Sequence, residues 1–259
     1  MKDLVKNGEI NIVFDGGALL YRVDWSKNAT FGSILSSYKA YIRNIIGKVE
    51  AEQTSVVFDG YLESSTKDHC HFKRCPIKSP DQCGDLERKL LCKKSIFLSN
   101  SKNKDNFIKL LARDLTESGF QVHQTNKDAD VEIITNAITA LGERDTLVIG
   151  DDTDLLVLAV HYMKEWGMSN NKLIMYRPSS HSYIDIGKVV SAHPDHVTSN
   201  ILAIHALSGC DTVSSLAGIG KTKLVKAIAK DEDLAEELST FSTPQFDDKT
   251  IEAGMANLS

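Results

Sequence analysis

Three short apolar runs, each followed by an aspartate, constrain this chain most strongly. The runs are residues 10–14 (INIVF), 54–58 (TSVVF) and 146–149 (TLVI), and the acids are Asp15, Asp59 and the segment 151–154. Apolar, β-branched runs bounded by glycine and aspartate are typical of buried strands. Between them lie segments of helical periodicity, such as the apolar stripe from Phe31 to Val49. Strands alternating with helices predict an α/β fold with a mainly parallel sheet flanked by helices.

Further elements follow from the same patterns. We predict a strand at 120–124 and a helix that begins near Asp128. A hairpin follows, in which residues 172–177 pair with 182–186. Three C-terminal helices are predicted over 187–193, 197–208 and 221–230. With 259 residues the chain can bury a substantial core. We expect one domain over residues 1–235, with an insertion at 61–100. The chain after Asp231 is acidic and polar, so we expect it to fray and to leave a poorly ordered tail at 236–259.

Composition limits the location and the partners of the protein. The sequence has no run of 18 apolar residues, which predicts no membrane span. Five cysteines without an apolar export signal predict reduced thiols in an intracellular protein. The net charge of −5 argues against binding nucleic acid with the whole surface. The segment 61–94, however, carries eight Lys/Arg against five Asp/Glu, so a nucleic-acid partner would be bound locally.

The acids of the chain fall where an α/β sheet binds its ligands, beyond the carboxyl ends of the strands. Seven are candidates for one site: Asp15, Asp59, Asp128, Asp130, Asp152, Asp154 and Asp211. Carboxylates about 4 Å apart repel one another, so such a cluster needs cations. Oxygen ligands without His or Cys select Mg²⁺ or Mn²⁺. Two such ions about 3.5–4 Å apart can generate hydroxide and stabilise the leaving oxygen of a phosphodiester. The pattern predicts two-metal phosphodiester hydrolysis.

Each acid taken alone has a structural reading as well. Asp15 and Asp59 precede glycines and are suited to turns. Asp128 is suited to cap a helix, with Asp130 complementing the helix dipole. We read Asp151 as a solvated loop acid and leave it out of the site. Chance rarely places acids at three successive strand ends and at the helix start between them, so the joint pattern favours a metal site.

Several segments of the chain resemble a known nuclease family. They are IVFDGGALLYRV, VVFDGYLESSTKDHCHFKR, KDADVEIITNAI, VIGDDTDLLVLA and ALSGCDTVSSLAGIGKTKLVKAI, which span roughly residues 10–230. They resemble the flap-endonuclease/XPG group of PIN-like nucleases, and especially the asteroid-like proteins of animal genomes. The resemblance implies a flap-endonuclease-like PIN fold and a nuclease of the 5′ type.

The same resemblance assigns the aspartates to two ions. It gives the first ion Asp15, Asp59 and the Asp128/Asp130 pair, and it gives the second Asp152, Asp154 and Asp211, with Asp130 shared. Flap endonucleases carry a glutamate pair where this chain has Asp128 and Asp130, and shorter side chains would change the metal spacing. The Met-Gly opening segment of flap endonucleases has no counterpart before Asp15. The resemblance therefore implies hydrolysis without implying selectivity for flaps.

The insertion after Asp59 resembles the basic helical arch of the family. Lys67 and Arg74 are seven residues apart, so a helix would place both on one face. The resemblance implies that they grip the scissile phosphate as catalytic residues; the alternative is a solvated basic surface. The cysteines of this stretch suggest zinc, but no C-x2-C pair is present and the zinc signal is weak.

The segment GIGKTKL (218–224) suggests a phosphate-binding loop. A P-loop needs glycine where this chain has Ser215, and it needs a preceding strand where the pattern is helical. We instead predict a helix–hairpin–helix over 205–230 and no nucleotide cofactor. Backbone N–H groups near Gly218 and Gly220 and the side chains of Lys221, Lys223 and Lys226 would hold a nucleic-acid phosphate. The alternative is a glycine turn between packed helices.

Two other functions compete with a nuclease. A haloacid-dehalogenase phosphohydrolase needs Asp-x-Asp at the first strand end, and neither Asp15-Gly16-Gly17 nor Asp59-Gly60-Tyr61 supplies it. A catalytically degenerate PIN-like fold that only binds nucleic acid or protein stays open, because intact acids do not prove turnover. For the nuclease we favour DNA over RNA and the nucleus over the cytoplasm.

Overall fold

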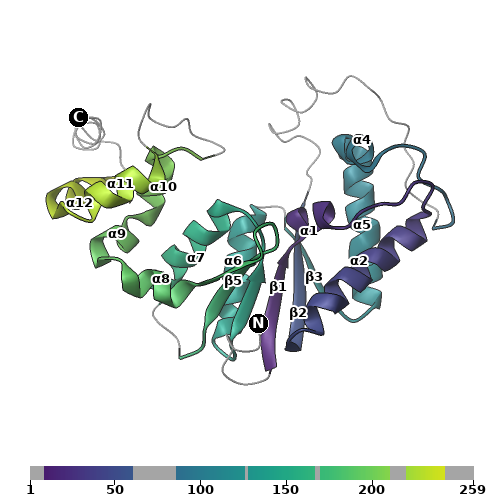
Figure 1. Ribbon diagram of the computed structural model, residues 1–259, viewed down its shortest axis with the longest axis horizontal. Helices are drawn as coiled ribbons and strands as arrows, with labels where there is room; N and C mark the ends of the chain where they lie inside the picture. Colours follow the sequence, from purple (N-terminus) through teal and green to yellow (C-terminus); the bar gives the residue numbers. More distant parts are fainter. Residues whose placement is uncertain (1–8, 61–85, 126–127, 167–169, 211–219, 243–259) are drawn as a thin grey trace. The chain divides into compact units, whose positions relative to one another are not determined.

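The computed structural model of the protein describes residues 9–60, 86–125, 128–166, 170–210 and 220–242 (Figure 1). Its strands are β1 (Glu9–Asp15), β2 (Glu50–Asp59), β3 (Gln121–Thr125), β4 (Thr146–Ile149), β5 (Leu173–Arg177) and β6 (Ser182–Asp185). They form one sheet in the order β3-β2-β1-β4-β5-β6. The pairs β1–β2, β1–β4 and β2–β3 are parallel, and β5–β6 is antiparallel. The predicted mainly parallel sheet and its hairpin are confirmed.

The contacts of the backbone divide the chain into two compact units, Met1–Gly150 and Asp151–Ser259. We describe each by itself, as unit 1 and unit 2. The single domain over residues 1–235 stays a prediction. The arch-like insertion also stays one, because residues 61–85 lie outside the described residues. Among the helices that the structure describes, none is long and apolar enough to cross a membrane.

Unit 1 holds helices on both sides of its strands. They are α1 (Gly16–Arg22), α2 (Phe31–Ile46), α4 (Lys94–Ser99), α5 (Ser101–Glu117) and α6 (Ala129–Leu141). The predicted helical stripe from Phe31 forms α2, which begins where the Thr30 hydroxyl accepts a hydrogen bond from the Ser33 N–H at 3.2 Å. Helices α4 and α5 pack on one another beside α2 (Figure 1).

Aromatic side chains fill the core between α2, α4 and α5. Phe31, Tyr38, Phe97 and Phe107 are each fully buried, and the Trp25 ring lies 4.8 Å from that of Phe107. The Tyr38 hydroxyl donates to the Leu20 carbonyl at 2.7 Å and accepts from the Trp25 indole N–H at 3.0 Å. Burial raises the pKa of Tyr38 well above its usual value, and the Trp25 hydrogen bond only partly offsets this.

Unit 2 consists of the β5–β6 hairpin and a set of short helices. They are α7 (Thr153–Glu165), α8 (Ile186–Ala192), α9 (Asp195–Ser199), α10 (Ile201–Leu207), α11 (Lys221–Ile228) and α12 (Glu232–Ser239), followed by a 3-10 turn at Thr240–Ser242. Their core cluster is Val197, Ile204, Leu224, Ile228, Ala235 and Leu238. This cluster joins α9, α10, α11 and α12 through apolar side chains at helical spacing.

The structure corrects two expectations about the helices of unit 2. The helix predicted over 197–208 is interrupted at Asn200, whose side-chain amide donates to the His196 carbonyl at 2.9 Å and to the Ala235 carbonyl at 3.1 Å. The chain was expected to fray after Asp231, but α12 begins there and is capped by that carboxylate, which accepts from the Leu234 N–H. Burial of Leu238 anchors the helix. The fraying prediction was wrong for residues 232–242, and the rest of the tail lies outside the described residues.

Candidate metal centre

Asp15 ends β1 and caps α1. Its Oδ1 accepts a hydrogen bond from the Ala18 N–H at 3.0 Å, so the local structural role of this acid is a helix cap and not the turn that the sequence suggested as its alternative. The glycine that follows is needed for space. A Cβ on Gly16 would lie 2.3 Å from the Phe58 ring and 2.5 Å from the Val57 carbonyl oxygen. Gly16 therefore allows the start of α1 to approach the end of β2 very closely.

Asp59 lies at the end of the neighbouring strand, on the same face of the sheet as Asp15. In the parallel register Asp15 is paired with Val57, so Asp59 is two residues further along β2. Two residues of a strand span about 7 Å and return the side chain to the same face. Asp59 is exposed. The carboxyl ends of β1 and β2 thus bring these two acids to one edge of unit 1.

Helix α6 places two more acids at that edge. The Asn11 side-chain amide donates to the Ala140 carbonyl at 3.1 Å, which fixes the end of α6 over the beginning of β1. Asn136 of α6 borders the same cavity as Val13 of β1, and α6 packs against β1, so the helix runs back along the strand. From 129 to 140 it rises about 16 Å, and from 11 to 15 the strand rises about 13 Å. Asp128 and Asp130 consequently lie near the level of Asp15, at the opposite end of α6 from Ala140.

Asp15 and Asp59 lie on the face of the sheet that α6 covers. Asn11, Ser55 and Asn136 line one polar cavity of about 210 Å³, so the odd-numbered residues of β1 and β2 face α6. Asp128 caps α6 by accepting from the Asp130 N–H at 3.2 Å, so the helix-cap reading of Asp128 is correct. Asp128 is exposed and Asp130 is half-buried.

Asp152 and Asp154 begin α7 in unit 2, directly after the fully buried strand β4. Oδ1 of Asp152 accepts from the Asp154 N–H at 3.0 Å. Oδ1 of Asp154 lies 3.0 Å from Nε2 of His205 on α10. No pattern in the sequence singles out His205, because a lone histidine in an apolar helix is usually a core residue.

Asp151 has a structural role. Its Oδ1 accepts from the Ser179 N–H at 2.9 Å, and its main-chain oxygen accepts from Nη2 of Arg177 at 2.8 Å. The expectation of a solvated loop acid was wrong, since Asp151 is half-buried and holds the turn between β5 and β6.

Several predicted site residues lie outside the described part of the chain. They are Lys67, Arg74, Asp211 and Gly218. The arch and the turn of the helix–hairpin–helix therefore stay predictions. Gly220 is described and stands at the N-cap of α11, where glycine has no side chain that could accept a hydrogen bond.

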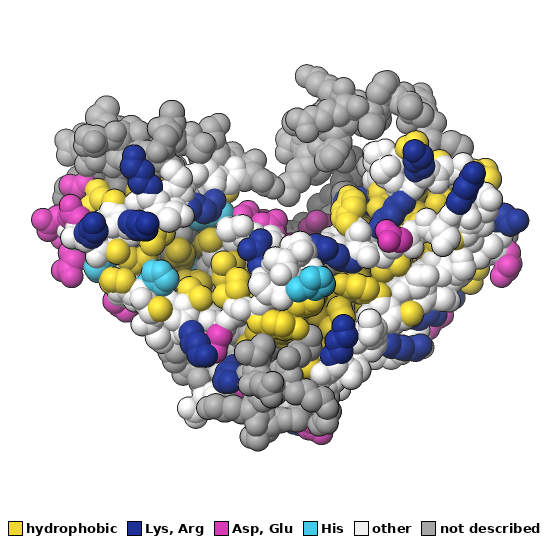
Figure 2. Space-filling model, in the orientation of Figure 1, with side chains coloured by type: hydrophobic (Ala, Val, Ile, Leu, Met, Phe, Trp, Pro, Cys, Tyr) yellow, Lys and Arg dark blue, Asp and Glu magenta, His cyan; other side chains and the backbone are white. Residues whose placement is uncertain are grey.

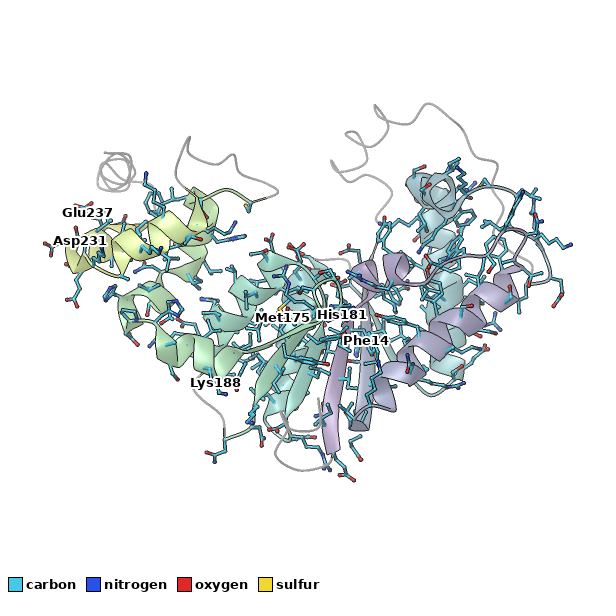
Figure 3. The ribbon with its side chains drawn as sticks, viewed as in Figure 1. Phe14, Met175, His181, Lys188, Asp231 and Glu237 are labelled. Atoms are coloured by element: carbon cyan, nitrogen blue, oxygen red, sulfur yellow. The ribbon has the colours of Figure 1, made fainter. Side chains whose placement is uncertain are left out.

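The three lysines of α11 differ in their surroundings. Nζ of Lys221 donates to the Gly209 carbonyl at 2.7 Å, whereas Lys223 and Lys226 are exposed. The neighbouring α12 packs against α11 through the apolar cluster and carries five exposed acids: Asp231, Glu232, Asp233, Glu236 and Glu237. Figure 2 shows acidic side chains gathered over α12 beside the basic ones of α11, and Figure 3 labels Asp231 and Glu237 on this helix. The acids oppose the positive field of the α11 lysines.

The donor set fits a hard divalent cation, although the described residues do not close around one. Within the ranges that the structure describes, no three Asp, Glu, His or Cys side chains form a metal-binding group. The candidate ligands are all aspartates, whose carboxylate oxygens are the ligand atoms that Mg²⁺ and Mn²⁺ prefer. The chemistry of the donors thus agrees with the predicted ions.

The chain matches no protein-family model and no curated protein. Its structure is similar to a variant of T5 5′-exonuclease, with a TM-score of 0.55 and 14% identity over 97% of this chain and 84% of that one. It is also similar to T5 5′-exonuclease with bound zinc ions, with a TM-score of 0.55 and 15% identity over 96% of this chain and 85% of that one.

A third similar structure is a bacteriophage T5 flap endonuclease variant, described as a pseudo-enzyme-product complex with DNA and metal ions. Its TM-score is 0.56, with 15% identity over 96% of this chain and 87% of that one. Identities this low establish the fold alone. The chain has the flap-endonuclease-like PIN fold that the resemblance predicted, and the relation to asteroid-like proteins stays a prediction.

Proposed function

We propose that this protein is a Mg²⁺- or Mn²⁺-dependent nuclease that hydrolyses phosphodiester bonds in nucleic acid, with DNA as the favoured substrate. One observation carries the proposal most directly. Asp15, Asp59 and the start of α6 share one face and one end of the sheet in unit 1, where an open α/β fold binds its ligands. The similarity of the fold to T5 5′-exonuclease supports the same class of chemistry.

Each unit would hold one divalent ion. In unit 1 the ligands are Asp15, Asp59, Asp128 and Asp130, and in unit 2 they are Asp152, Asp154 and Asp211. When bound, such ions supply an activated hydroxide and a positive charge for the leaving oxygen.

The helix caps prepare these carboxylates for that role. Asp15, Asp128 and Asp152 each use Oδ1 to accept a backbone N–H at the start of a helix. The bond fixes the orientation of the carboxylate, which can bind a cation through its second oxygen. Ligands held in place before binding lose little conformational freedom when the ion arrives.

The proposal is tested by a cleavage assay with Mg²⁺ and Mn²⁺ on matched single-stranded, duplex, 5′-flap and RNA substrates. The expected result is metal-dependent cleavage that EDTA abolishes and that Asp154→Asn lowers by orders of magnitude. Absence of cleavage on every substrate, by protein shown to be folded, contradicts the proposal.

A second candidate is a catalytically degenerate PIN-like module that binds nucleic acid or a partner protein. The observation that favours it is the lack of a closed three-ligand group in the described ranges. The two functions are distinguished by titrating Mn²⁺ and following cleavage in the same samples. Metal binding without turnover supports the module, and turnover rejects it.

A further inference from the structure

His205 contacts one of the proposed metal ligands and joins two helices of unit 2. It lies on α10, and its Nε2 is 3.0 Å from Oδ1 of Asp154 in the first turn of α7. The two side chains are 11% and 33% exposed, respectively. The contact is therefore partly shielded from water, mainly on the His205 side. Solvent and salt weaken electrostatic interactions less at such a place than at the surface.

The imidazole of His205 has poor alternatives to this contact. Neither ring nitrogen makes a hydrogen bond of good geometry with any described residue, so the ring N–H is not aligned with the nearby carboxylate oxygen. The ring borders an apolar cavity of about 200 Å³ that Val157 and Val225 also line. A buried polar ring with incomplete hydrogen bonding lowers stability. Such departures from a fully satisfied interior are expected at functional positions.

We infer that His205 is a positioning residue for Asp154, and this inference rests on the proposed nuclease site. The main chain of Asp154 is already fixed, because its N–H donates to Asp152. Rotation of the side chain is the freedom that remains. The His205 ring lies 3.0 Å from Oδ1 and limits this rotation, so it favours one orientation of the carboxylate. Donors behind the ligands of a metal commonly orient them in this way.

The competing explanation is a contact that only holds α7 and α10 together. His196 provides a matched control for that role. It is another partly buried histidine of unit 2, and its Nε2 lies 2.9 Å from the Ile228 carbonyl, so it joins α9 to α11 without touching Asp154. Replacing His196 should lower the stability of unit 2 and leave metal binding unchanged.

The experiment measures Mn²⁺ binding by calorimetry without nucleic acid, and urea unfolding, in the same variants. His205→Leu should weaken Mn²⁺ affinity about 10–100-fold. His205→Gln should keep most of the affinity, because its amide reaches about the position of Nε2, whereas the shorter His205→Asn should not. In the Asp154→Asn background, His205→Leu should cause no further loss. If His205→Leu does not fold, the Mn²⁺ affinities of the Gln and Asn variants are compared instead.

Two outcomes overturn the inference. The first is that His205→Leu binds Mn²⁺ as tightly as wild type and loses as much stability as His196→Leu. His205 would then only hold α7 and α10 together. Equal affinities of the Gln and Asn variants would show that a polar atom at the position of Nε2 beside Asp154 is irrelevant. The proposed function fails separately, when Asp154→Asn itself changes neither Mn²⁺ affinity nor cleavage. Loss of binding in Asp154→Asn together with unchanged binding in His205→Leu rejects the positioning role alone.

Discussion

The side-chain amide of Asn11 donates to the carbonyl of Ala140, and this bond joins the last turn of α6 to the first half of β1. The last carbonyls of a helix lack partners within the helix. The Glu143 and Arg144 N–H groups bond the Ala140 oxygen from beyond the helix, each at 3.2 Å, and Asn11, which is 3% exposed, adds a donor from inside the sheet. Because α6 begins with Asp128 and Asp130, the bond at one end of the helix determines how far the other end reaches toward Asp15.

Replacing Asn11 should therefore lower stability. Asn11→Leu removes the side-chain donor to the Ala140 carbonyl, which keeps its two backbone donors, and it also removes the Asn11 Oδ1 atom, which is buried without a partner in the described structure. We expect a net loss of about 1 kcal/mol in the free energy of unfolding by urea. Asn11→Asp places a carboxylate beside a carbonyl oxygen and should be worse, by about 3 kcal/mol or more. An Asn11→Leu protein at least as stable as wild type would show that the bond does not hold α6.

A methyl group at Gly16 should disturb both structure and activity. Gly16→Ala places a carbon 2.3 Å from the Phe58 ring and 2.5 Å from the Val57 carbonyl, so the backbone must shift, at about 1–3 kcal/mol. The shift would also move Asp15. Gly17→Ala is the matched control, because its nearest neighbour is the Asp15 Oδ1 at 3.1 Å and alanine favours the helix. Thermal unfolding and cleavage rates test both variants, and equal behaviour of the two would contradict the packing argument.

Tyr38 should make the protein sensitive to alkaline pH. Its pKa is raised in the folded state by burial, so the folded protein keeps the proton where the unfolded chain loses it. The contribution to stability is complete below the unfolded pKa of about 10 and declines as pH rises above it. Urea unfolding between about pH 8 and pH 11 should show this decline, and Tyr38→Phe should reduce the slope while losing the bonds to Leu20 and Trp25. An unchanged slope in Tyr38→Phe would assign the pH dependence to other groups.

Asp151 and Asp152 should respond differently to the same substitution. Asp152→Asn removes a proposed ligand charge and should lower cleavage by orders of magnitude with little change in stability. Asp151→Asn weakens the bond to the Ser179 N–H, so it should lower the free energy of unfolding by about 1 kcal/mol and leave most of the activity. Rates and unfolding midpoints measured together distinguish the two. Equal loss of cleavage in both variants would mean that the ligands are misassigned.

Local patterns predicted the framework of the fold and the positions of the acids. The runs that form β1, β2 and β4 and the stripe that forms α2 are encoded by neighbouring residues, so their types and approximate bounds could be found from sequence. Distant contacts could not. The break at Asn200 depends on Ala235, the role of Asp151 on Ser179, and the contact of His205 on Asp154.

Helix α12 was missed for a related reason. Its exposed acids dominate its composition, and only Ala235 and Leu238, at helical spacing, reveal the buried side. A short polar segment with two apolar anchors has a weak periodic signal. The packing surface on α11 that makes the helix stable is formed by residues that the local pattern does not include.

The acids of α12 also bear on how fast a polyanion can arrive. From 220 to 242 the chain has four lysines and five carboxylates, so beyond a Debye length of about 8 Å at physiological salt the two helices present almost no net charge. A phosphate is then attracted by Lys223 and Lys226 only at short range, after it has diffused there unaided. Encounters at this surface would proceed at the 10⁵–10⁶ M⁻¹s⁻¹ or so of unsteered association and change little with ionic strength.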